Sequence, residues 1–147
     1  MTNVALVLAK LTTLRDHLGR IEKRRPADVE SLRGDLDRQD ALALSVLVAL
    51  QEAADIALHM ASDEGWGVAS SYADSFTLLA RHQVIDARLA SRLAGIAALR
   101  NRIAHGYGTV DVDRLWADSP AGVEALREYA AAIAGYLDQA RGAQSDA

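Results

Sequence analysis

The residues best suited to chemistry gather in one short segment, residues 99–108 (LRNRIAHGYG), of a chain otherwise rich in Ala, Leu and Val. Two guanidinium groups, a carboxamide, an imidazole and a phenol are present there: Arg100, Asn101, Arg102, His105 and Tyr107. An α-helix turns about 100° per residue, so Asn101 and His105 share one face, whereas Arg100 lies about 140° from His105. This is more polarity than helix packing requires, and the segment is therefore our candidate site.

A helix end at Gly106 would allow these groups to meet. Glycine commonly ends helices through a left-handed backbone conformation, so the sequence predicts that His105 lies in the last turn or at the C-cap. The long Arg100 side chain can then reach round the helix end toward the imidazole and the phenol. A last-turn histidine also lies at the negative end of the helix dipole, which favours its protonated form and suits proton transfer near neutral pH.

The sequence offers little support for other kinds of chemistry. The histidines are scattered, cysteine is absent, and no His-Glu-x-x-His pattern occurs, so we predict neither a metal site nor a cofactor. No Walker loop or dinucleotide-binding loop is present, and a Ser-His-Asp site has no local signature. The remaining candidate is metal-free phosphoryl chemistry, for which RNA would be a suitable substrate because it supplies its own nucleophile, the 2′-hydroxyl.

In this chemistry His105 would move protons, and Arg100 would stabilise the pentacovalent phosphorane with its forked donors. Asn101 would hold the imidazole or bind a phosphate oxygen. A single acid–base group typically accelerates a reaction by about 10²- to 10⁴-fold, so one histidine alone would make only a modest enzyme. A homodimer would bring two copies of the segment together and supply both an acid and a base. We expect its interface on the apolar second long helix or on the face that carries the segment.

Composition predicts a single cytoplasmic domain over residues 1–147, half hydrophobic and about a quarter charged. The N-terminus lacks the features of a signal peptide, and the apolar stretch 41–50 is too short to span a bilayer, so no membrane association is expected. The net charge of −4 argues against a general nucleic-acid coat. Any RNA site must therefore be a local basic pocket, which Arg100 and Arg102 can supply, doubled if two subunits share a cleft.

Apolar residues recur at helical spacing throughout, and no strand-like alternation occurs, so we predict an all-α antiparallel bundle of four or five helices. Ser71, Asp86 and Ser119 are predicted N-caps, the last followed by a first-turn proline, Pro120. Residues 142–147 are predicted to be a frayed tail. The expected helices cover residues 3–25, 39–62, 72–82, 86–105, a short segment from 113, and 120–141, with residues 26–37 as a linker or short helix.

A polar stripe interrupts the apolar second long helix, because Gln51, Asp55 and His59 follow each other at four-residue spacing with Glu52 beside them. Buried carboxylates are costly unless paired, so the stripe must face water, a basic partner or a cleft. Two interpretations stay open. Asp55 either forms a second wall of the site by orienting an arginine or His105, or makes a structural ion pair with His59 or an arginine of another helix.

Three further polar residues have simpler explanations. Arg24 and Arg25 come just before Pro26, and cations in the last turn of a helix explain them better than nucleic-acid binding does. His82 is predicted to be a capping or surface group at a helix end. These residues are therefore not included in the candidate site.

The spacing of Arg100, His105 and Tyr107, with Asn101 directly after the arginine, resembles the R-x-x-x-x-H-x-Y signature of the HEPN superfamily, most closely its HepT-like toxin branch. The likeness extends over most of the chain. QEAADIALH (residues 51–59) resembles the polar-striped second long helix of that branch, and SYADSF (residues 71–76) resembles the third.

This resemblance implies a ribonuclease toxin that is paired with a minimal nucleotidyltransferase antitoxin. The antitoxin would modify Tyr107 with AMP. A nucleotide attached beside Arg100 and His105 would fill the pocket and neutralise its charge, which explains how the modification would silence the toxin. The simpler alternative for Tyr107 is a phenol that packs against the turn.

A second function class competes with the enzyme. The chain can be a non-catalytic HEPN module that partners a nucleotidyltransferase and holds nucleotide or substrate. The complete pair of Arg100 and His105 favours the enzyme, whereas the acidic pI of about 5.5 and the lack of basic clusters favour the module. A purely structural bundle leaves the polar residues of the segment unexplained.

Overall fold

The computed structural model describes residues 1–105 and 111–146, apart from the side chains of residues 103–105. This part of the chain contains six helices and no strand, which confirms the predicted all-α fold. The helices are α1 (Val4–Arg24), α2 (Val29–Arg33), α3 (Leu36–Glu64), α4 (Tyr72–Arg81), α5 (Ala87–His105) and α6 (Val112–Ser145). Five of them form the bundle, and α2 is a short helix in the connection from α1 to α3.

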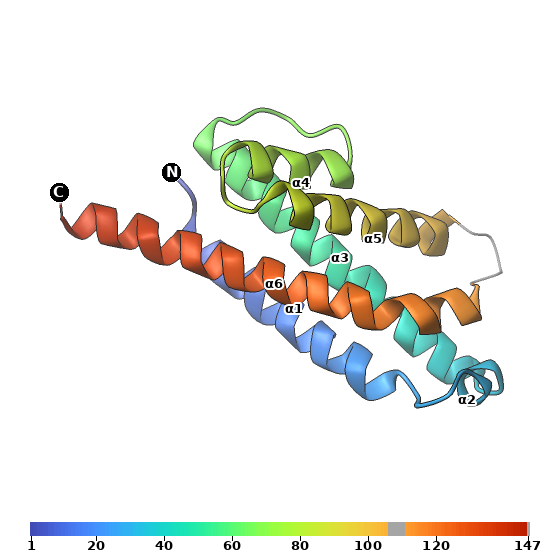
Figure 1. Cartoon of the computed structure of the whole chain (residues 1–147). Coiled ribbons are helices and arrows are strands. Elements are labelled where there is room, and N and C mark those ends of the chain that lie inside the picture. The colour runs from blue at the N-terminus through green and yellow to red at the C-terminus, as the bar shows by residue number, and fades with distance from the viewer. Residues whose placement is uncertain (106–110, 147) are drawn as a thin grey trace.

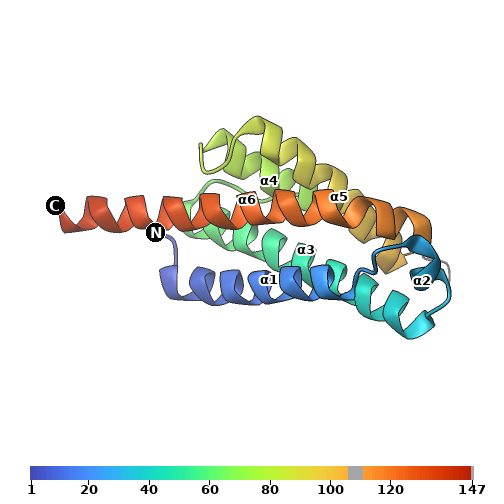
Figure 2. The ribbon, with the colours of Figure 1, turned by 60° about the horizontal axis from the view of Figure 1, so that its bottom comes forward.

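The helices α1, α3 and α6 run along the length of the molecule, and the pair α4 and α5 packs against α3 and α6 on the side away from α1 (Figure 1 and Figure 2). The rotated view separates α1 and α3 from α6 (Figure 2). The chain reverses direction at most connections, but α3 and α4 run the same way because residues 66–71 cross over α4 (Figure 1). The end of α5 and the start of α6 therefore lie at the end of the bundle away from both termini.

The core is formed by the apolar stripes that the sequence predicts. The stripe on α1 is buried, and α5 contributes Leu89, Leu93 and Leu99. At the centre, the fully buried Tyr129 of α6 packs edge-on against Phe76 of α4, with 5.6 Å between the ring centroids. Its hydroxyl donates a 2.7 Å hydrogen bond to the Ala53 carbonyl of α3, so three helices meet at this residue. Burial raises the pKa of Tyr129 well above its usual value, which keeps the phenol neutral.

The α3 helix is long and apolar enough to cross a membrane by length and composition, with a mean hydropathy of 1.7 over its most apolar window. More than half of that window is buried inside the bundle, as expected for a core helix of a folded domain. The helix ends at Gly65, whose φ of 69° places it in the left-handed region that favours glycine.

The helix starts confirm two predicted N-caps. The Ser71 Oγ accepts a 3.0 Å hydrogen bond from the backbone N–H of Asp74 at the start of α4. The Asp86 Oδ1 accepts a 2.7 Å hydrogen bond from the backbone N–H of Leu89 at the start of α5. These contacts satisfy backbone donors that the first helical turn leaves without partners.

The predicted helix start at Ser119 and Pro120 is wrong, because α6 is one continuous helix that contains Pro120. Proline lacks the N–H that would bond to the carbonyl four residues earlier, which here belongs to Trp116. Two side chains replace the missing donor: the Arg25 Nε donates to the Trp116 carbonyl oxygen at 2.8 Å, and the Ser119 hydroxyl donates to it at 3.3 Å. The Arg25 guanidinium carbon also lies 4.1 Å from the indole centroid of Trp116. The helix also continues to Ser145, so the predicted fraying of the tail does not begin at Gly142.

Candidate functional site

The last turns of α5 carry the candidate site. This helix extends through His105, so the backbone places His105 at the helix end, where the sequence predicted it. The His105 side chain, Gly106 and Tyr107 lie outside the described residues. The turn at Gly106 and the meeting of imidazole, phenol and Arg100 therefore stay predictions.

Arg100 is held against the start of α4. Its guanidinium carbon lies 4.8 Å from the ring centroid of Tyr72, the first residue of that helix. The Nη1 donates a 3.3 Å hydrogen bond to the Asn101 Oδ1. The Nε is buried and has no hydrogen-bond partner among the described residues. A ring face and a carboxamide oxygen thus orient the arginine without neutralising it.

Five arginines of the described chain differ from Arg100 in this respect, because they pair with carboxylates, whereas Arg24, Arg25 and Arg102 resemble it in having no ion pair with a described residue. Six such ion pairs link these arginines to acidic residues: Arg33–Glu30, Arg33–Asp113, Arg38–Asp35, Arg92–Glu128, Arg114–Asp118 and Arg127–Glu22. Arg100 forms no ion pair with a described residue. Its positive charge is therefore available to an anion such as a phosphate.

Arg102 does not join Arg100 within one chain. The two residues are about 160° apart on the helix, so they point to different neighbours. Arg100 faces α4, whereas Arg102 lines a groove between α5 and α6 with a volume of about 260 Å³. The expectation that both arginines form one pocket is therefore not met in the single chain.

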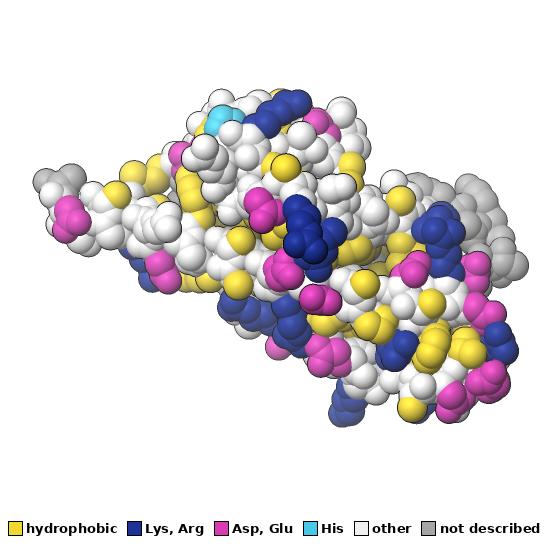
Figure 3. Space-filling view, viewed as in Figure 1, with side chains coloured by type: hydrophobic (Ala, Val, Ile, Leu, Met, Phe, Trp, Pro, Cys, Tyr) yellow, Lys and Arg dark blue, Asp and Glu magenta, His cyan; other side chains and the backbone are white. Residues whose placement is uncertain are grey.

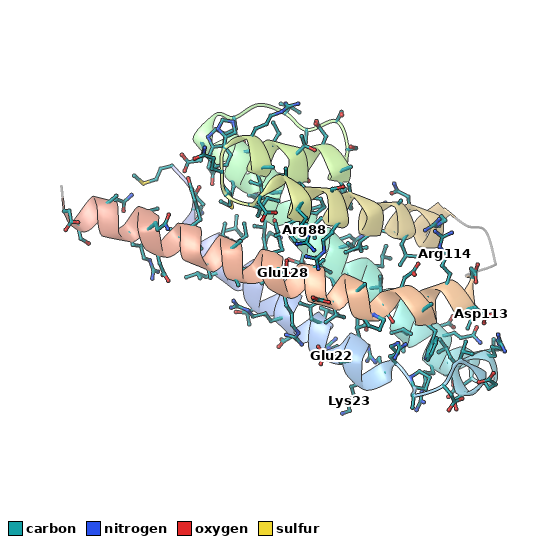
Figure 4. All side chains as sticks on the ribbon, in the orientation of Figure 1. Glu22, Lys23, Arg88, Asp113, Arg114 and Glu128 are labelled. Carbon is teal, nitrogen blue, oxygen red and sulfur yellow. The ribbon has the colours of Figure 1, made fainter. Side chains whose placement is uncertain are left out.

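The groove between α5 and α6 is mostly apolar, with arginines at its rim. Ile96 and Leu99 line it from α5, and Arg92 and Arg114 lie at its edges. In Figure 3 the surface along this groove shows yellow apolar side chains between dark-blue patches of Lys and Arg. In Figure 4, Arg114 marks the first turns of α6 at the end where α5 also finishes. Arg92 and Arg114 are each paired with an acid, Glu128 and Asp118, which limits the positive charge of the rim.

Asp55 lies on the side of α3 that faces α1. Its carboxylate is 3.5 Å from the Lys10 Nζ, and Glu52 contacts the same ammonium group at the same distance. This is a structural ion pair between helices, although with a lysine rather than with His59 or an arginine. Within one chain the described contacts of Asp55 do not reach the end of α5.

Arg24, Arg25 and His82 have clear structural roles. Arg24 bonds to Ser45 of α3, and Arg25 bonds to the Trp116 carbonyl, so both are structural cations at the end of α1. His82 caps α4 and stacks on Trp66 with 4.4 Å between the ring centroids. The described residues contain no group of three or more side chains arranged to hold a metal ion.

Sequence reasoning missed two residues. Tyr72 was recognised only as part of the third-helix likeness, although an aromatic residue directly after the Ser71 cap signals a side chain fixed at a helix start. His17 of α1 was not singled out. Its Nδ1 is buried without a hydrogen-bond partner in the described chain. Burial lowers the pKa of His17, Arg20 and Arg24 lower it further, and Asp16 and Glu52 oppose them.

Comparison with known structures places the bundle in the class of HEPN toxins. The tri-AMPylated HEPN toxin of Shewanella oneidensis, solved in complex with MNT antitoxin, superposes with a TM-score of 0.81 at 25% identity. The match covers 92% of this chain and 99% of that one. The Bacillus subtilis protein YutE, described as a cytosolic protein of unknown function, shares the fold with a TM-score of 0.82 at 18% identity, covering 94% of this chain and 92% of that one.

Sequence comparison identifies the family within this class. The model of the family Ribonuclease HepT-like matches residues 14–133, and the chain belongs to this family. The mRNA nuclease HepT of Shewanella oneidensis is 29% identical over 108 residues, which cover 74% of this chain and 80% of that protein. The tRNA nuclease HepT of Aphanizomenon flos-aquae is 23% identical over 139 residues, which cover 93% and 95%.

Proposed function

We propose that the protein is a metal-independent endoribonuclease and the toxin of a toxin–antitoxin pair, with Arg100 and His105 as its catalytic residues. One observation carries the proposal. In a chain of a ribonuclease family, the helix that ends at His105 holds an arginine whose charge no described carboxylate neutralises. A cytoplasmic location is proposed with it, as expected for an enzyme that acts on cellular RNA.

The proposed reaction is a transesterification within the RNA chain. The ribose 2′-hydroxyl attacks the adjacent phosphorus and its proton passes to the His105 imidazole, while the bond to the 5′-oxygen breaks. That oxygen takes a proton from an imidazolium, which leaves a 2′,3′-cyclic phosphate and a 5′-hydroxyl. Arg100 stabilises the charge on the phosphorane oxygens, and Asn101 supports the arginine through its oxygen.

A homodimer completes the proposed site. Two subunits related by a twofold axis would place two imidazoles and two Arg100 guanidinium groups at one cleft, so one imidazole can act as base and the other as acid. Arg102 would add positive charge from its own face of α5. Asp55, which pairs with Lys10 in one chain, would reach this cleft only from the partner subunit.

The proposed regulator is a minimal nucleotidyltransferase antitoxin. The relatives supply the support: the Shewanella toxin was solved tri-AMPylated with MNT antitoxin, and a related toxin–antitoxin structure contains AMP-PNP. In this chain the Tyr107 oxygen would attack the α-phosphorus of ATP, with pyrophosphate as the leaving group. The added phosphate would compete with RNA for Arg100.

Cleavage of a labelled RNA by the purified protein tests the proposal. We expect H105A and R100A each to lower the cleavage rate by about 10²-fold or more, because each removes a group that acts in the transition state. H59A is the matched control, since it removes an exposed histidine of α3. Cleavage should persist in a chelator. If H105A cleaves like the wild type, or if the wild type binds RNA or nucleotide without cleaving, the chain is the non-catalytic module instead.

A further inference from the structure

We propose that Tyr72 is a positioning residue for the catalytic arginine. Its ring fixes the Arg100 guanidinium in place before RNA binds. The inference rests on the proposed ribonuclease function and adds a residue from outside the R-x-x-x-x-H-x-Y segment. It starts from the 4.8 Å stacking contact between the first residue of α4 and the last turns of α5.

The Tyr72 backbone is firmly anchored. The preceding residue, Ser71, caps α4 by accepting the Asp74 N–H, and the Asp74 carboxylate accepts the Ser70 N–H at 2.9 Å. The Ser75 hydroxyl donates a 2.6 Å hydrogen bond to the Tyr72 carbonyl. These bonds tie both sides of the residue to the first turn of the helix, so the ring is presented by a fixed backbone rather than by a loose loop.

A ring suits the arginine better than a carboxylate would at this position. A carboxylate partner would neutralise the guanidinium and compete with phosphate for its donors, as Glu128 does for Arg92 at 2.6 Å. An aromatic face attracts the cation through its quadrupole but leaves the in-plane N–H groups free to form hydrogen bonds. The stacking contact therefore orients the donors toward a ligand without occupying them.

Fixing the arginine in advance also lowers the cost of catalysis. A free arginine side chain loses rotamer freedom when it grips a phosphate, and a stacked one has already lost most of it. The buried Nε supports this view, because a group so enclosed has little room to move. Removal of the ring should therefore weaken the stabilisation of the transition state more than it weakens the binding of RNA.

A double-mutant cycle between Tyr72 and Arg100 tests the coupling. We expect Y72L to lower kcat/KM about tenfold, mainly through kcat, which corresponds to about 1.4 kcal/mol. Y72F keeps the ring and should retain nearly full activity. In an R100Q background, where the cation and its fork are absent, Y72L should cause no further loss. Additive effects of Y72L and R100Q would overturn the proposal.

Y136L provides the matched control for lost packing. Tyr136 is also half-buried, but it packs against Trp66 in a different part of the bundle. Thermal unfolding should show comparable losses for Y72L and Y136L, whereas only Y72L should slow RNA cleavage. Equal losses of activity in the two variants would mean that Tyr72 merely supports the fold, which would contradict a positioning role.

An NMR measurement separates this inference from the proposed function. A proton above a ring face is shielded, so the Arg100 Hε signal should be shifted upfield in the wild type and in Y72F, and should return toward its usual position in Y72L. Absence of this difference refutes the stacking even in an active enzyme. If the wild type cleaves no RNA, the proposed function fails, and the NMR result still decides whether Tyr72 positions Arg100.

Discussion

The hydrogen bond from Arg25 to the Trp116 carbonyl is the shorter of the two that compensate for Pro120 within α6, and R25A tests its contribution. The substitution removes a 2.8 Å charged hydrogen bond and a cation–π contact of 4.1 Å. A hydrogen bond to a charged group contributes about 1.5–3 kcal/mol and an exposed cation–π pair about 0.5–1 kcal/mol. The two interactions involve half-buried residues and are made by the same side chain, so their contributions do not simply add. We therefore expect R25A to lower the free energy of unfolding by about 2 kcal/mol. For a domain of this size this corresponds to roughly 4–8 °C in Tm.

The cause can be isolated by returning the missing donor to the helix. P120A restores an N–H that can bond to the Trp116 carbonyl. The loss in free energy of unfolding caused by R25A should therefore be about 1 kcal/mol smaller in the P120A background than in the wild type. R20A serves as a control for net charge, because Arg20 is an exposed arginine of α1, the helix that Arg25 follows. Chemical and thermal unfolding give both differences. An equal cost of R25A in the two backgrounds would refute the role assigned to Arg25.

Two further predictions follow from the face shared by α1 and α3. The pKa of His17 is lowered by burial, so the unfolded chain takes up a proton more readily than the folded chain, and stability falls as the pH drops through about 6.5. The fall in Tm between about pH 7.5 and 5 should therefore be smaller in H17L than in the wild type and the H59L control, and an equal fall in all three would contradict this. Because Asp55 pairs with Lys10 at a partly exposed position, we expect D55N to lower the free energy of unfolding by less than about 1 kcal/mol and to leave RNA cleavage unchanged. A large loss of cleavage would instead support the role of Asp55 as a second wall of the site.

Most helices could be predicted from local patterns. The stripe of α1, the Ser71 cap and the Asp86 cap each depend on neighbouring residues, and the structure confirms them. The break at Pro120 could not be judged this way, because the shorter of the two hydrogen bonds that compensate for it comes from Arg25, far away in the sequence, and only the longer one comes from the neighbouring Ser119. Local rules describe the cost of a proline in a helix but not the distant side chain that offsets it.

The candidate site was only partly accessible from sequence for the same reason. Helical geometry separates Arg100 from Arg102, yet it does not say that Arg100 meets α4 while Arg102 meets α6. The stripe around Asp55 was recognised as polar, but its partner could not be chosen among the available cations until Lys10 was placed beside it. The side chain of His105 and the position of Tyr107 remain sequence predictions.

Residues 66–71 cross over α4, so the length of this connection determines where α4 begins relative to the Arg100 side chain of α5. A ten-residue helix is about 15 Å long, and the connection must travel back along it before Tyr72 can begin α4 beside Arg100. A connection whose main contribution to the core is Trp66, at its start, thus determines which residue lies under the arginine. Insertions or deletions there, usually regarded as harmless, would shift the register of α4 against α5 and change the enzyme without altering any residue of its signature.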